Sequence, residues 1–346
     1  MKKPLLFVSV FILLSCGGKD GPEVQNEFSR QAFLTAYAEQ FLIPDFANAA
    51  TKVSALNLEI GLQSNAENLD MAKSLWQEAY MAYLKVSLFN FGPAAEEVLT
   101  KSLVEEVATF PINTAAINVK LDSGDFGFTD FKRDTRGFLA LEYLLYNEEV
   151  QSNSNWLAYI KEASSDVAQR ISNVSESWGS FQSDFVSNDG TAAGSSTSVM
   201  YNEFLKSFEG LKNFKLGLPL GLRPGQMQAL PMNVEAPFSK QNLLFLNQHF
   251  QTLKAFWTGP SGRGFKDYLM TVEGGPALVN STELQLEEVE VAFGNVSESD
   301  FETGVLDGNE DLINLHTELQ KLTRFFKSEM SSLLGIAITF SSGDGD

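Results

Sequence analysis

The chain has 346 residues, enough for one large domain or two of ordinary size, so a sizeable hydrophobic core can form without disulfides. It carries 44 Asp and Glu against 25 Lys and Arg, a formal net charge of -19 that would repel nucleic acid over most of the surface. One cysteine and two histidines exclude, within one chain, a disulfide framework, a cysteine-ligated iron–sulfur cluster and a three-histidine zinc site. We therefore expect no nucleic-acid partner and no His-rich zinc site.

The first residues predict export and lipid attachment. A basic start, Met1-Lys2-Lys3, precedes an apolar run over 5–14 that is too short for a permanent membrane span. The letters LLSC over 13–16 resemble a bacterial lipobox, which predicts a lipoprotein signal peptide over 1–15 and a mature N-terminus at Cys16. Cys16 would carry the lipid, with acyl chains such as palmitate, and 16–27 would be a tether. The alternative is an ordinary signal peptide that ends near a cysteine.

This leader predicts a location in the bacterial cell envelope. No Asp follows Cys16, which favours an anchor in the outer membrane over retention in the inner membrane. We therefore expect the membrane to be a partner through Cys16. The body of the protein would be periplasmic or exposed on the cell surface.

The remaining chain shows mostly helical periodicity and little strand-like alternation. In the clearest segment, Leu69, Ala72, Trp76, Tyr80 and Tyr83 share one apolar stripe. The first expected helix covers 28–41, and after a break or kink at Pro44 a second stretch continues to about 62. The other segments expected to be helical are 66–89, 94–109, 129–146, 155–186, 195–214, 239–257, 264–272, 283–292 and 309–335. About four helices in each half predict an all-α fold of two packed helical bundles, 28–190 and 191–346. The stretch 217–237, rich in Gly and Pro, is too long for an idle connection and is expected to be functional or packed.

One segment carries a family resemblance. The letters DTRGFLALEYLLY over 134–146 resemble the signature of the imelysin-like family of bacterial envelope proteins, Gly-x-His-x-x-Glu followed by Tyr-Leu-Leu and an aromatic residue. Further segments that resemble the family pattern in order and spacing are SLWQEAY (74–80), YNEF (201–204), LGLPLG (216–221), EAPFS (235–239) and LGIAITF (334–340). The resemblance implies an all-α protein of two bundle-like halves with a site at their interface. It also implies an association with iron uptake and, in the founding member, proteolysis.

The chain departs from this motif at one position. Leu139 stands where the family has its histidine, whereas Gly137 and Glu142 remain. A His and a Glu three apart on a helix can share a metal or pass a proton, and leucine can do neither. The peptidase label should therefore not be transferred to this chain.

The resemblance makes five residues candidates for a ligand site between the halves: Arg136, Glu142, Glu203, Glu235 and Ser239. A buried Glu142 would need a counter-charge from Arg136 or from a lysine of the 203–212 ladder of alternating Glu and Lys. The alternatives are that Glu142 is a solvated or Arg-paired helix residue and that the ladder is a solvated face. No cofactor is indicated; carboxylates alone would suit a hard cation or iron more than zinc.

Two functions from different classes remain. The first is a non-catalytic, lipid-anchored envelope protein that binds a ligand, an iron species or a partner between its halves, as an accessory of iron or haem uptake. The second is a degenerate peptidase-like hydrolase that uses Glu142 with Glu203 or Glu235. A structural or adhesion module would have no polar cleft. His249 and His316 lack a partner at ligand spacing and are expected to be ordinary helix residues, so no nucleophile–histidine pair is predicted.

Overall fold

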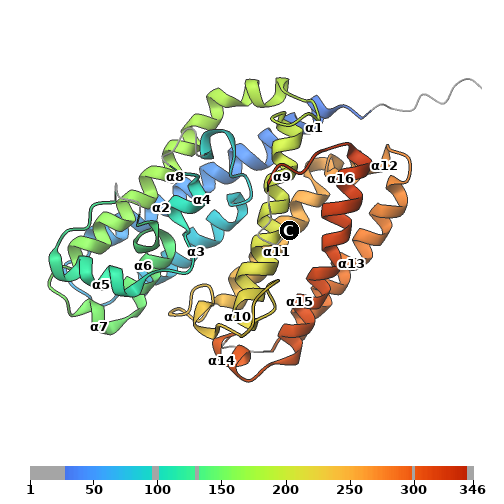
Figure 1. Cartoon of the computed structure of the whole chain (residues 1–346). Coiled ribbons are helices and arrows are strands. Elements are labelled where there is room, and N and C mark those ends of the chain that lie inside the picture. Colours follow the sequence, from blue (N-terminus) through green and yellow to red (C-terminus); the bar gives the residue numbers. More distant parts are fainter. Residues whose placement is uncertain (1–27, 96–100, 129–131, 298–300, 341–346) are drawn as a thin grey trace, which may run out of the picture.

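The computed structural model describes residues 28–95, 101–128, 132–297 and 301–340. Within these ranges all regular structure is helical, which confirms the all-α fold (Figure 1). The predicted signal peptide over 1–15, Cys16 and the tether over 16–27 lie outside the described residues. In the described part of the chain, no helix combines the length and the apolar character that crossing a membrane requires.

Three long helices form the frame of the N-terminal half. Helix α1 (Arg30–Tyr37) continues through a π-helical turn, Ala38–Leu42, into α2 (Ile43–Leu62). Pro44 lies in the first turn of α2, directly after the π-helical turn, so the expected break is a change of helix type within a continuous helix. Helix α2 packs along both α3 (Asp70–Val86) and α8 (Trp156–Ser187).

Short helices close the other side of this half. They are α4 (Leu103–Val107), α5 (Thr114–Ser123), α6 (Gly137–Tyr146) and α7 (Glu148–Gln151). Every residue of α6 from Gly137 to Leu145 is buried. Gly137 has φ +84°, and a Cβ there would meet the Val107 carbonyl oxygen at 2.4 Å. Glycine is therefore required where α6 begins.

The C-terminal half is a second helical layer (Figure 1). Helix α9 (Ser196–Glu209) runs through a π-helical segment, Gly210–Gly217, into the short α10 (Leu218–Leu220). The helices that follow are α11 (Asn242–Thr258), α12 (Phe265–Met270), α13 (Gly275–Asn295), α14 (Phe301–Leu306), α15 (Glu310–Thr323) and, after a π-helical turn over Arg324–Glu329, α16 (Met330–Leu334).

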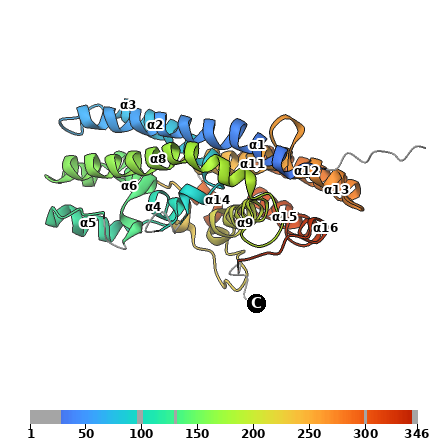
Figure 2. The same cartoon turned by 90° about the horizontal axis from the view of Figure 1, so that it is seen from above.

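The two halves meet along α3 and α11, which pack against each other. Helix α1 also reaches the C-terminal half, where it contacts α9, and Figure 2 shows it close to α11 and α12. The Tyr37 hydroxyl donates to the Phe256 carbonyl, and the Phe28 ring stacks on Tyr268 with centroids 4.4 Å apart. The expected boundary between 190 and 191 lies in the connection from α8 to α9, and α1 bridges the two sides of it.

Candidate functional site between the two halves

A buried carboxyl group from the C-terminal half meets a tyrosine from the N-terminal half. Glu235, 3% exposed, lies in the connection between α10 and α11. Its Oε1 accepts a hydrogen bond from the Tyr80 hydroxyl on α3 and lies 2.7 Å from the Lys215 ammonium. Asn242 fixes the backbone of this connection, because its side-chain amide donates to the carbonyls of Glu235 and Ala236. Lys215 is therefore the counter-charge of this carboxyl group.

A second carboxyl group, Glu142 on α6, lies near the first. It is fully buried, and its Oε1 accepts a hydrogen bond of 2.6 Å from the backbone N–H of Ser239. Burial raises the pKa of Glu142 to about 8; hydrogen bonds from Ser239 and Phe238 lower it in part, and the charge of Glu235 raises it further. At pH 7 this side chain is therefore mostly a neutral carboxylic acid, and it is held by the residues that directly follow the Gly- and Pro-rich stretch 217–237.

Several polar atoms of this cluster lack a partner within the described ranges. They are the Tyr83 hydroxyl, Oε2 of Glu142, Oε2 of Glu235 and Nδ1 of His249. Burial, followed by the charge of Glu235, raises the pKa of both Tyr80 and Tyr83, so both phenols stay protonated. Buried polar groups are paired in the great majority of cases. These four atoms lie in one region of the interface, where a bound molecule could pair with them.

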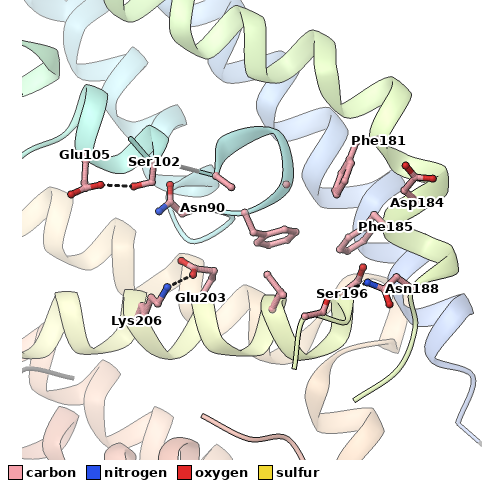
Figure 3. A pocket seen from close by; sticks show the side chains of 15 residues that line it. Asn90, Ser102, Glu105, Phe181, Asp184, Phe185, Asn188, Ser196, Glu203 and Lys206 are labelled. Atoms are coloured by element: carbon pink, nitrogen blue, oxygen red, sulfur yellow. Dashed lines mark hydrogen bonds and ion pairs between the residues drawn. The ribbon is translucent and has the colours of Figure 1, made fainter. Parts of the chain in front are cut away.

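A cavity of about 310 Å³ opens between the halves at this cluster. Tyr83, Glu235, Lys215, Ser207 and His249 are among its lining residues. A neighbouring cavity of about 680 Å³ shares the wall formed by Asn90, Ser102, Glu105, Glu203 and Lys206. Figure 3 shows Glu203 and Lys206 of α9 facing Ser102 and Glu105 across that second cavity. The two cavities share this polar wall and together form a cleft whose lining comes from both halves.

The five candidate residues occupy three places. Glu142, Glu235 and Ser239 belong to one cluster. Glu203 lines the cleft and pairs with Lys206 at 2.5 Å; burial raises its pKa, and Lys206 lowers it in part. Arg136 is buried in the N-terminal half and pairs with Glu106 at 2.5 Å.

Other members of the site were not singled out from the sequence, although Tyr80 ends the family-like segment SLWQEAY (74–80). Tyr80 and Tyr83 belong to the apolar stripe of α3 and could not be told from packing residues. His249 is no isolated helix residue, because its Nε2 lies 2.7 Å from Oγ of Ser207 on α9. Ser207 and His249 are 42 positions apart on different helices, so no local spacing could reveal this hydrogen-bonded serine–histidine pair, which the sequence did not predict.

Three-ligand metal sites are absent from the parts of the chain that the structure describes: no three His, Cys, Asp or Glu side chains there are grouped to hold an ion. The groups at the cluster that could ligate a metal are two carboxyl groups, one of them already paired with Lys215, and two protonated phenols. This set offers hydrogen bonds to a bound molecule, and it is a poor match for a bare divalent ion.

The fold resembles two solved structures. One, described as an iron-regulated protein A precursor from Parabacteroides distasonis, has a TM-score of 0.74 and 16% identity, and the match covers 89% of this chain and 95% of that chain. The other, an imelysin-like protein from Psychrobacter arcticum, has a TM-score of 0.71 and 18% identity, covering 90% and 97%. A comparison with curated proteins gave no match. The family model described as imelysin matches residues 42–325, which include α6, the carboxyl cluster and the cleft, so this chain belongs to the imelysin family.

Proposed function

We propose that this protein is a lipid-anchored envelope protein that binds a ligand in the cleft between its halves and serves as an accessory of iron or haem uptake. The observation that carries the proposal is the set of unpaired buried atoms at the 310 Å³ cavity, above all the Tyr83 hydroxyl and Oε2 of Glu235. A buried polar group without a partner costs about 1–3 kcal/mol. A bound molecule that pairs with these atoms would recover this free energy on binding.

The charges of the cluster favour a particular kind of ligand. Glu142 is largely neutral at pH 7, and Glu235 is matched by Lys215, so the cluster has little net charge to attract a bare cation. Its free atoms include a donor, the Tyr83 hydroxyl, and carboxyl oxygens. A ligand that carries both hydrogen-bond donors and hydrogen-bond acceptors fits this arrangement. Iron would therefore bind here as part of a complex, with most of the coordination positions of the iron already filled by atoms of that complex.

Two further observations support the biological setting. One of the structural neighbours is described as an iron-regulated protein, and the altered motif, with Leu139 in place of histidine, removes the usual partner of Glu142 for acid–base or metal chemistry. The lipobox-like LLSC over 13–16 supports attachment to the outer membrane through Cys16. Binding, with no metal-dependent peptide cleavage, is the function that these observations favour.

The test is titration of the purified full chain with ferric citrate and with haem, followed by tryptophan fluorescence and calorimetry. We expect saturable binding of at least one of them, weakened about five- to tenfold by Tyr83→Phe, since one hydrogen bond contributes about 1 kcal/mol. Glu235→Gln should weaken binding as well. The matched control is Tyr143→Phe, because the Tyr143 hydroxyl bonds Asn118 at 3.0 Å and does not line the cavity. Equal affinity in the native protein and in both cavity variants would refute the proposed site, and no binding of either compound would refute the iron assignment.

A further inference from the structure

Ser207 and His249 form a hydrogen-bonded pair inside the cleft. Ser207 lies in the last turn of α9, and its Oγ is 2.7 Å from Nε2 of His249 on α11. Other helical serines of this chain, such as Ser177 and Ser331, donate to the carbonyl four residues earlier. The Ser207 hydroxyl instead meets the imidazole, which is the arrangement of a nucleophile with its general base.

The imidazole is neutral and carries a free lone pair, but it is a weaker base than an exposed histidine, because burial and the charge of Lys215 oppose its protonation. His249 is 5% exposed, and burial, followed by the positive charge of Lys215, holds its pKa well below the usual value. The ring is therefore neutral at pH 7, and one of its nitrogens carries a lone pair. In the tautomer with the proton on Nδ1, Nε2 accepts the hydroxyl proton of Ser207.

The surroundings supply the other requirements of acyl transfer. Ser207 and His249 both line the 310 Å³ cavity, so a small molecule can reach them. The Tyr83 hydroxyl lines the same cavity, stays protonated and has no acceptor in the described ranges. A donor of this kind can stabilise the oxyanion that forms when a carbonyl is attacked. Apolar side chains complete the wall: Leu84, Val104, Ala108, Phe110 and Phe214.

We infer that this cavity is an acyl-transfer site in which Ser207 is the nucleophile, His249 the general base and a small ester with an apolar acyl group the substrate. This inference goes beyond the proposed binding function, because it needs neither iron nor the membrane. It also differs from the hydrolase considered from the sequence, which relied on carboxyl groups.

The reaction proceeds in two balanced steps. Oγ of Ser207 forms a bond to the carbonyl carbon while its proton moves to Nε2 of His249, and the ester C–O bond then breaks as the alcohol leaves with that proton. Water next attacks the acyl-serine, giving its proton to His249, and Ser207 leaves with the proton as the carboxylic acid is released. The Nδ1 atom of His249 has no carboxylate partner among the described residues, so we expect both steps to be slow. With an activated ester the leaving group speeds only acylation, so the acyl-enzyme should accumulate.

The test uses the full chain with two probes, a fluorophosphonate and p-nitrophenyl acetate. A fluorophosphonate reacts with an activated serine by forming a Ser O–P bond and releasing fluoride. We expect about one label per chain, located on Ser207 by peptide mass spectrometry, and a burst of nitrophenol of matching size. Ser207→Ala should abolish both, and His249→Gln should slow labelling on the order of 10²-fold, the low end of the contribution of a general base, because the lowered pKa makes His249 a weak base. Tyr83→Phe should slow it without removing it.

The matched control is Ser87→Ala. Ser87 lines the same cavity, but its hydroxyl donates to the Leu84 carbonyl at 3.0 Å, so its removal should leave the rate unchanged. Circular dichroism of each variant checks that the fold is kept. An unlabelled native protein, or labelling that survives Ser207→Ala, would overturn the inference, and so would native labelling rates in a folded His249→Gln protein. Because Ser207→Ala should still bind the iron compounds, failure here is distinguishable from failure of the proposed function.

Discussion

Tyr80 on α3 donates its hydroxyl to Glu235, a residue 155 positions further along the chain and in the other half of the molecule. The same carboxyl group holds Lys215 at 2.7 Å. A buried carboxylate is stable only with such partners. The carboxylate of Glu235 in the C-terminal half is therefore stabilised in part by the Tyr80 phenol of the N-terminal half. The interface is therefore a polar cluster surrounded by packed aromatic rings. Within this cluster, Glu142 is the group whose protonation should change near neutral pH.

Stability should fall as the pH rises from about 5 to 8 because of Glu142. Its folded-state pKa of about 8 lies above the ordinary value of 4.5, so in this window the unfolded chain loses the proton while the folded protein keeps it. The free energy of unfolding then decreases with pH by up to about 1.4 kcal/mol per unit. The Glu142→Gln protein has no ionisable group at this position, so its free energy of unfolding should change less between pH 5 and 8. Urea unfolding at several pH values measures this free energy for both proteins.

The control for this experiment is Glu148→Gln, because Glu148 is exposed at the start of α7. It should keep the native pH dependence. If the Glu142→Gln protein showed the same slope between pH 5 and 8 as the native protein, the buried carboxyl group would not be protonated as described.

A second prediction concerns the buried ion cluster around Glu106. This carboxylate, 1% exposed, lies 2.5 Å from Arg136, 3.2 Å from Arg170 and 3.3 Å from Arg133. Removing the shared carboxylate leaves buried guanidinium charge uncompensated, so Glu106→Gln should lower the free energy of unfolding by about 3–5 kcal/mol.

The same substitution in an exposed pair provides the comparison. Glu78 pairs with Lys52 at 2.7 Å, and both side chains are at least 40% exposed. Glu78→Gln should cost less than about 1 kcal/mol. Equal losses for Glu106→Gln and Glu78→Gln, in chemical denaturation at one pH, would contradict the assigned role of burial.

A third prediction concerns the altered motif. Leu139 is 2% exposed in a helix that is buried on all sides. Leu139→His should therefore destabilise the protein by about 1–3 kcal/mol, the cost of burying an imidazole with incomplete hydrogen bonding. Leu139→Met, which keeps the volume, should cost less than about 1.5 kcal/mol. The measurement is the thermal unfolding midpoint of the native protein and of both variants. A Leu139→His protein as stable as the native protein would show that this position already tolerates a polar group.

The fourth prediction concerns the anchor. If Cys16 carries the lipid, Cys16→Ala should move the protein from the detergent phase to the aqueous phase on detergent partitioning, because the acyl chains supply the membrane affinity. Serine at position 16 provides a second variant without a thiol. Partitioning of the alanine variant into the detergent phase would remove the lipoprotein assignment.

The long helices could be predicted from the sequence, because apolar residues at helical spacing pack one face of each helix. The segment expected over 155–186 is observed as α8 (Trp156–Ser187), and that over 239–257 as α11 (Asn242–Thr258). Helix α5 was missed, since only Ile117, Lys120 and Leu121 of it are buried and its apolar stripe is weak. The start of α6 was placed too early, at 129, because the chain forms a short 3₁₀ turn over Arg133–Thr135 before Gly137 opens the helix.

The site was only partly predictable. Glu142, Glu235 and Ser239 could be named because they lie in segments with the family pattern. Lys215, Tyr83 and the Ser207–His249 pair could not, because how the helices pack decides which of their residues meet. Ser207 and His249, for example, are 42 positions apart and leave no local spacing in the chain.

Helix α1 has a consequence for the order of folding. Its partners Phe256 and Tyr268 are more than 200 positions further along the chain, since Tyr37 donates to Phe256 over 219 positions and Arg30 donates to Tyr268 over 238. Contacts of such high sequence separation carry a large loop-closure entropy and form late. Helix α1 packs on α8 within its own half, but its contacts with the C-terminal half must wait for most of the polypeptide. A chain that ends before α12 would leave Phe28 and Phe33 without their ring partners Tyr268 and Phe265.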